Sequence, residues 1–131
     1  MRKLILIVLC VMLLTACGQT AVETETVQEA VYMNITAEEA KKLMDTEKDY
    51  IILDTRTQEE YEESHIPGAI LIPYDQITEK AESILKDKDQ LILVYCRSGR
   101  RSKLAAQDLV TLGYTNIKEF GGIIDWPYEV E

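Results

Sequence analysis

The chain has 131 residues, a length that fits a single globular domain. Acidic residues outnumber basic residues by 23 to 14, and the formal net charge is −9 at neutral pH. This balance argues against nucleic acid as a partner and against electrostatic attachment to an anionic membrane.

The N-terminal residues have the pattern of a bacterial export signal. Two basic residues precede an apolar run over residues 4–14, which is shorter than the roughly 20 apolar residues of a membrane-spanning helix. The sequence LTAC at residues 14–17 follows, and it resembles the lipobox of bacterial lipoproteins. We therefore expect residues 1–16 to be a lipoprotein signal peptide that is removed in front of Cys17.

Residues 17–33 are expected to form the lipidated N-terminus and a flexible tether, because glutamates are scattered there among small and polar residues without periodicity. On this interpretation the protein is extracytoplasmic and is anchored to the bacterial cell membrane by lipid on Cys17. The alternative is a plain secretion signal that is cut nearby and leaves Cys17 unmodified.

The remaining cysteine is the main candidate for chemistry. If Cys10 leaves with the signal and Cys17 carries lipid, Cys96 remains as a thiol without a disulfide partner. Free cysteines are commonly buried and inert. Three arginines and one glycine follow Cys96 within five positions, however, and this polar neighbourhood favours a reactive thiol.

Residues 34–131 alternate between strand and helix patterns. Strands are predicted at residues 50–53, 69–72, 90–95 and 116–120, with a short fifth strand near residues 32–35. Helices are predicted at residues 37–45, 58–63, 77–85 and 102–112. This order predicts an α/β domain with three layers, in which helices cover both faces of a mainly parallel sheet of four or five strands.

Local signals support several of these boundaries. Two helix starts carry a capping box, Thr36 with Glu39 and Thr57 with Glu60. The dipeptide at residues 121–122 is Gly-Gly, and we expect it to begin a closing turn after the last strand.

Polar residues follow the carboxyl ends of two predicted strands, where parallel sheets bind ligands. Asp54 and Arg56 follow one strand and Cys96 follows another, so we expect them to share a site. Asp54 is expected to support the Cys96 loop by accepting backbone N–H hydrogen bonds, and Arg56 is expected to pair with Glu60. Direct contact with substrate is the alternative role for Asp54 and Arg56.

The segment CRSGRRS at residues 96–102 leads from a predicted strand through a glycine-containing turn into a helix. Backbone N–H groups in such a turn, closed by a helix N-terminus, bind anions and favour thiolate over thiol. Cys96 is therefore the expected nucleophile of an anion-binding loop. No role as a general base is expected for His65, because an existing thiolate needs none.

Five residues of this loop are expected to bind substrate, namely Arg97, Ser98, Gly99, Arg100 and Arg101. Arg97 and Arg101 are the main candidates for holding an anionic donor, because guanidinium groups make multidentate contacts with oxyanions. Arg100 either shares this role or points to solvent. Gly99 is expected to allow close backbone approach or a positive φ, and Ser102 to act as a helix cap or a loop hydrogen-bonding group.

Five separated motifs occur in one order: LDTR at 53–56, HIPGA at 65–69, YCRSGRRS at 95–102, LGY at 112–114, and GGI at 121–123 with Trp126. Together they resemble the rhodanese superfamily over about residues 34–131. The resemblance implies a single-domain rhodanese-like fold and a sulfurtransferase in which Cys96 carries sulfane sulfur as a persulfide. It also implies a small anionic donor such as thiosulfate or a persulfide, and a thiol or cyanide acceptor. We expect no cofactor, no metal and a monomer.

Two alternatives to sulfur transfer stay open. A phosphatase or arsenate reductase of the same fold would space its cysteine and arginine as C-x5-R. Cys96 and Arg101 follow C-x4-R, which shortens the loop and suits one sulfur atom better than a phosphoryl group. The second alternative is a surface-tethered binding module without turnover, which would have no need of the cysteine.

Overall fold

The computed structural model describes residues 31–131, so the expected signal peptide, Cys17 and nearly all of the tether lie outside the described residues. The fold is built on a five-stranded sheet with the strand order β1-β5-β4-β2-β3. The strands are β1 (Met33–Asn34), β2 (Tyr50–Asp54), β3 (Ile70–Leu71), β4 (Leu91–Cys96) and β5 (Ile117–Gly122). Every neighbouring pair is parallel, which confirms the predicted sheet, including its short fifth strand.

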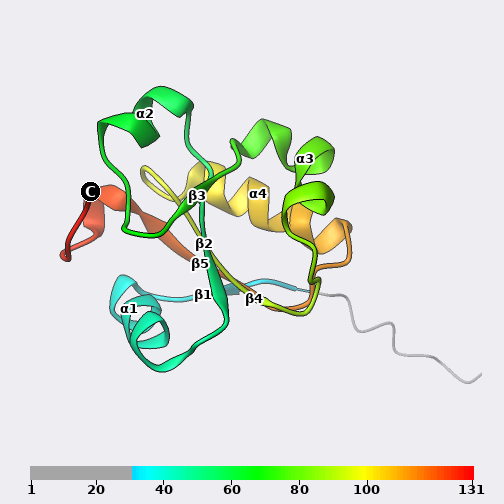
Figure 1. The fold of residues 1–131 in the computed structure, drawn as a ribbon, viewed down its shortest axis with the longest axis horizontal. Helices are drawn as coiled ribbons and strands as arrows, with labels where there is room; N and C mark the ends of the chain where they lie inside the picture. Colours follow the sequence, from blue (N-terminus) through cyan, green and yellow to red (C-terminus); the bar gives the residue numbers. More distant parts are fainter. Residues whose placement is uncertain (1–30) are drawn as a thin grey trace, which may run out of the picture.

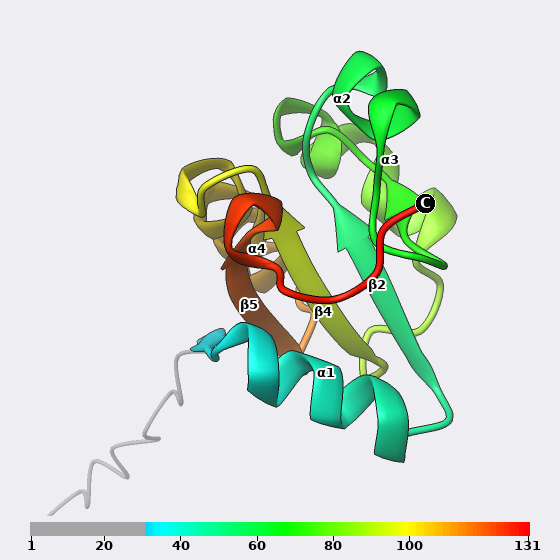
Figure 2. The ribbon, with the colours of Figure 1, turned by 90° about the vertical axis from the view of Figure 1, so that its left-hand side faces the viewer.

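Helices cover both faces of this sheet, as Figure 1 and Figure 2 show. The helices are α1 (Ala37–Thr46), α2 (Gln58–Glu63), α3 (Ile77–Ile84) and α4 (Arg100–Thr111), with short 3-10 turns at η1 (Tyr74–Gln76) and η2 (Ile123–Asp125). Helix α1 lies on one face, and α3 and α4 lie on the other (Figure 2). Within residues 31–131, none of the helices combines the length and the apolar character needed to cross a membrane.

The two capping boxes predicted from sequence are present. At the start of α1 the Thr36 hydroxyl accepts from the Glu39 N–H, and the Glu39 carboxylate accepts from the Thr36 N–H. Thr57 and Glu60 make the same reciprocal pair at the start of α2. Each box pairs backbone donors that a helix N-terminus otherwise leaves free.

Strand β4 lies at the centre of the sheet, and all six of its residues are buried. Alternate residues face opposite layers, as the strand pleat requires. Ile92 and Val94 pack towards α3 and α4, whereas Leu93 and Tyr95 pack towards α1. The sheet thus separates two hydrophobic clusters, and Cys96 continues on the side of Ile92 and Val94.

The last strand differs from its predicted form. The expected turn at residues 121–122 is wrong, because β5 continues through Gly122, which pairs with Cys96 after an irregularity in the ladder. A Cβ on Gly122 would lie 1.8 Å from the carbonyl oxygen of Arg97. Glycine is needed here because the end of β5 packs directly on the backbone that follows Cys96.

Candidate active site

Cys96 is the last residue of β4, and its side chain is 1% exposed. The chain then turns through Gly99, which has φ of +106°, and enters α4 at Arg100. Helix α4 therefore begins two residues earlier than predicted. Glycine allows the left-handed backbone at this position, and the turn brings the Gly99 N–H to 3.0 Å from the Cys96 Sγ.

The surroundings of Cys96 stabilise its anionic form. Burial alone would raise the pKa of the thiol. Hydrogen bonds from the Ser102 hydroxyl and from the backbone N–H groups of Ser102, Gly99 and Ser98 outweigh burial, and the pKa of Cys96 is lowered. The sulfur thus sits at the mouth of a helix, where backbone donors and the helix dipole favour a thiolate.

Ser102 lies in the first turn of α4, where its hydroxyl contacts the loop and does not cap the helix. The N-cap of α4 is Gly99, which makes no side-chain capping bond. The fully buried Ser102 hydroxyl lies 3.2 Å from the Cys96 Sγ and 2.7 Å from a carboxylate oxygen of Glu119. Of the two roles predicted for Ser102, the loop hydrogen bond is the one the structure contains.

The three arginines of the loop have different environments. Arg97 and Arg100 are exposed, and within residues 31–131 their guanidinium groups have no hydrogen-bond or ion-pair partner. Arg101 is largely buried, and its two terminal nitrogens lie 2.7 and 2.8 Å from the two carboxylate oxygens of Glu60. Anion binding by Arg101 stays a prediction, and in this structure both terminal nitrogens of its guanidinium group bond to Glu60.

Asp54 and Arg56 form a buried pair beside the loop. The Asp54 carboxylate accepts from the Arg56 backbone and guanidinium and from the Tyr95 hydroxyl, which lies at 2.6 Å. The prediction that Asp54 accepts backbone bonds from the Cys96 loop is wrong. The predicted Arg56–Glu60 pair is also wrong, because Arg56 precedes α2 and bonds to Asp54 and the Ser64 carbonyl.

Glu119 was missed by sequence reasoning. It lies on β5 and is 2% exposed; its Oε1 is 2.7 Å from the Ser102 hydroxyl oxygen and accepts a hydrogen bond from the Gly121 N–H. Its signal was a single acidic residue between Ile117 and Phe120, at a position that strand alternation places on the same face as Ile117.

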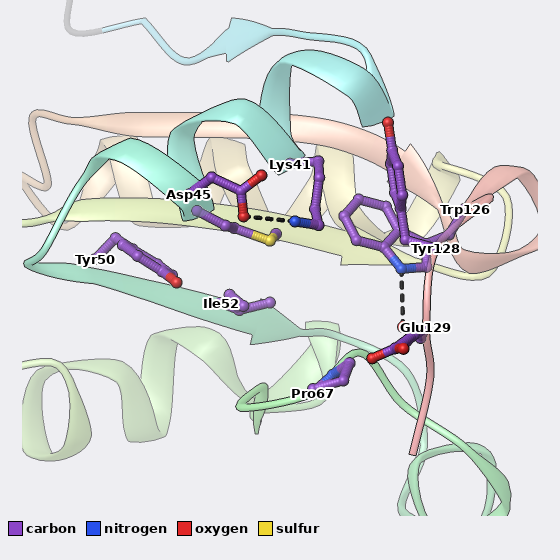
Figure 3. Close-up of a pocket in the computed structure, with 9 residues that line it drawn as sticks. Lys41, Asp45, Tyr50, Ile52, Pro67, Trp126, Tyr128 and Glu129 are labelled. Carbon is purple, nitrogen blue, oxygen red and sulfur yellow. Dashed lines mark hydrogen bonds and ion pairs between the residues drawn. The ribbon is translucent and has the colours of Figure 1, made fainter.

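A separate cavity of about 560 Å³ opens between α1 and the C-terminal segment (Figure 3). Its lining residues are Lys41, Met44, Asp45, Tyr50, Ile52, Pro67, Trp126, Tyr128 and Glu129. None of the predicted site residues contributes to it. The nucleophile therefore lies at the end of β4 and not in this cavity.

The fold and the cysteine loop define a rhodanese-like domain. The family model for the rhodanese-like domain matches residues 36–127, which is most of the chain, and the protein belongs to this family.

Named relatives narrow the activity in general terms. The chain is 37% identical over 73 residues to thiosulfate sulfurtransferase PspE of Escherichia coli, covering 56% of this chain and 70% of that protein. It is 35% identical over 97 residues to thiosulfate sulfurtransferase GlpE of Coxiella burnetii, covering 73% and 88%. Other curated relatives are much longer, and the chain spans 21 to 24% of two of them. These relationships support a sulfurtransferase function in general.

Solved structures agree with this family. A structure described as a rhodanese with anions from E. coli superposes with a TM-score of 0.59 at 33% identity. The match covers 63% of this chain and 96% of that one.

Proposed function

We propose that the protein moves sulfane sulfur from an anionic donor, such as thiosulfate or a persulfide, to a thiol or cyanide through a persulfide on Cys96. The observation that carries the proposal is the Gly99 N–H at 3.0 Å from the Cys96 Sγ, at the mouth of α4. This geometry, with the lowered pKa of Cys96, supports an anionic sulfur nucleophile.

With thiosulfate as donor, the reaction needs no oxidant or reductant. The Cys96 thiolate attacks the outer sulfur, the sulfur–sulfur bond of thiosulfate breaks, and sulfite leaves with the bonding pair. The product is a Cys96 persulfide whose negative charge is on the outer sulfur. Cyanide then attacks that sulfur, thiocyanate leaves, and the Cys96 thiolate is restored. The loop N–H groups stabilise the anion at both stages without rearrangement.

The donor would be received by the exposed guanidinium groups of the loop. Arg97 and Arg100 are solvent-accessible and have no partner among the described residues, so their donors are available to a sulfonate. Arg101 adds positive charge close to Cys96 while it stays bound to Glu60. The solved E. coli rhodanese is described as having anions with it, which is consistent with this assignment.

We also propose that the protein is a lipoprotein held outside the cytoplasm by Cys17. The support is the sequence pattern of residues 1–17. Labelling of an expressing bacterium with a fatty acid should mark the native chain and leave Cys17→Ser unmarked. Equal labelling of the two chains would refute the anchor.

The activity is tested by two separate assays. In the first, the native chain should form thiocyanate from thiosulfate and cyanide, and Cys96→Ser should form none. The second assay, with an aryl phosphate, tests the alternative function of a phosphatase. Phosphate release that disappears in Cys96→Ser, without thiocyanate formation by the native chain, would favour a phosphatase instead.

A further inference from the structure

A second buried acid lies one hydroxyl away from the nucleophile. Cys96 is 1% exposed, Glu119 is 2% exposed, and Ser102 between them is fully buried. The Ser102 Oγ is 3.2 Å from the cysteine sulfur and 2.7 Å from the Glu119 Oε1. Thiol and carboxyl therefore belong to one buried hydrogen-bonded chain.

The number of protons shared by Cys96, Ser102 and Glu119 limits the total charge of these three side chains. Ser102 carries one hydroxyl proton, and an ionised carboxylate can only accept. When Ser102 donates to an ionised Glu119, its oxygen can only accept, and the 3.2 Å contact with Cys96 is a hydrogen bond only if Cys96 is a thiol. When Ser102 donates to a Cys96 thiolate, the 2.7 Å contact with Glu119 is a hydrogen bond only if the carboxyl is protonated.

Other contacts of the three residues do not remove this constraint. The Ser102 hydroxyl also lies 3.1 Å from the Gly99 carbonyl and 3.4 Å from the Gly121 carbonyl, and both of these oxygens only accept. The Gly121 N–H donates to Glu119 at 2.8 Å, and a carboxyl oxygen can accept this bond in either protonation state.

We propose that Cys96 and Glu119 share a single proton through Ser102, so that Glu119 takes up the thiol proton when Cys96 becomes the nucleophile. The role of this shared proton rests on the proposed function, namely that the proton stays inside the protein during sulfur transfer. The thiol loses a proton to Ser102, Ser102 passes its own proton to Glu119, and the pair keeps one negative charge throughout.

Among the described residues, no positive side chain forms an ion pair with Cys96 or Glu119. Lys103 of α4 points its amine towards Gly99, and Lys103 and Glu119 do not form an ion pair. Arg101 of α4 is close to Cys96 but is bound to Glu60. On the other side of β4, the charges of Asp54 and Arg56 are paired with one another. Two negative charges on Cys96 and Glu119 would therefore repel at short range in a buried site, and such pairs titrate as a unit.

Glu119 acts through Ser102 and is a positioning residue, so its test needs a readout of the thiolate itself. The full-length chain is first freed of bound sulfur with cyanide. Its rate of alkylation by iodoacetamide is then followed against pH by mass spectrometry of the peptide that contains Cys96. This reaction reports the thiolate and needs no sulfur donor.

In the native chain, the alkylation rate of Cys96 should rise with pH in two steps, because Cys96 and Glu119 together lose two protons, one after the other. Glu119→Gln should show a single step, about one pH unit or more below the upper native step, because the amide carries no charge. Glu119→Asp keeps the carboxyl and should keep two steps. Glu79→Gln makes the same change of charge at an exposed position of α3 and should match the native chain.

A native profile with one step, or a Glu119→Gln profile that coincides with the native one, would overturn the shared proton. Thermal unfolding of each variant shows whether it is folded, and a purely structural effect of Glu119→Gln would change rates without removing a step. Persulfide loading by thiosulfate is measured separately on the same proteins. If the native chain does not load sulfur but titrates in two steps, the proposed function fails and the shared proton stands.

Discussion

Arg101 and Glu60 form a two-pronged ion pair between the start of α4 and the start of α2, with nitrogen–oxygen distances of 2.7 and 2.8 Å. The same Glu60 carboxylate completes the capping box of α2. One side chain therefore joins the helix that follows the Cys96 loop to the helix that follows β2. The pair keeps Arg101 beside Cys96 and at the same time engages both terminal nitrogens of the Arg101 guanidinium group.

The ion pair predicts a specific loss of stability in acid. The hydrogen bond from Arg101, assisted by those from Thr57, lowers the pKa of Glu60 from 4.5 to about 2. Because the pKa of Glu60 is lower in the folded protein than in the unfolded chain, its carboxylate stabilises the fold at pH values above 4.5. This stabilisation falls as the pH drops from 4.5 towards about 2. Urea unfolding at stepwise lower pH should show Glu60→Gln less stable than the native chain by about 1–2 kcal/mol at neutral pH.

The difference between the two proteins should narrow below pH 4.5. Glu79→Gln on α3 is the matched control, since Glu79 is exposed. A constant difference between native and Glu60→Gln at all pH values would contradict the assignment.

The close packing of β5 on the loop predicts that Gly122 tolerates no side chain. Gly122→Ala places a methyl group 1.8 Å from the Arg97 carbonyl oxygen, so the backbone after Cys96 must move. We expect a loss of about 1–3 kcal/mol in unfolding free energy and a large loss of sulfur transfer.

Gly68→Ala provides the comparison for Gly122→Ala. Gly68 has φ of +81°, and no atom lies within 4 Å of the place that a Cβ would take, so only backbone strain is added there. This variant should lose about 1 kcal/mol of stability and keep its activity. Full activity in folded Gly122→Ala would show that the loop does not depend on this contact.

The free guanidinium groups predict which arginines bind the donor. Arg97→Ala and Arg100→Ala should each raise the KM for thiosulfate by about tenfold with kcat largely kept, since each removes one charged contact with the anion. Lys80→Ala removes an exposed charge on α3 and should leave steady-state kinetics unchanged. Unchanged KM values in both arginine variants would exclude these side chains as the donor site.

The buried pair beside the loop predicts a strong structural effect. Asp54→Asn leaves the buried Arg56 without its charge partner and removes an acceptor from Tyr95. We expect a loss of about 3–5 kcal/mol in unfolding free energy, measured by urea denaturation. Tyr95→Phe removes only the hydroxyl contacts and should cost less. Near-native stability of both variants would show that these contacts do not hold the carboxyl ends of β2 and β4 together.

Much of the fold could be predicted from the sequence because its signals are local. Apolar runs and capping boxes such as Thr57 with Glu60 lie within a few residues of the structure they specify. Cys96 was recognisable for the same reason, since its strand, turn and helix are continuous in sequence.

The pairing of charged side chains was not predictable in this way. Arg101 and Glu60 are 41 positions apart and meet only when α2 and α4 are placed on the sheet. The expected Arg56–Glu60 pair applied helical spacing to Arg56, which lies before α2 begins. Glu119 could have been flagged by strand alternation, but its contact with Ser102 depends on the approach of β5 to α4.

The central claim is that Cys96 itself carries the sulfur. The direct test is the intact mass of the full-length chain after treatment with thiosulfate, followed by peptide mapping. We predict that the native chain gains the mass of one sulfur atom on the Cys96 peptide, that cyanide removes it, and that Cys96→Ser gains none. A native chain that gains no sulfur, or a sulfur found only on another cysteine, would contradict the account.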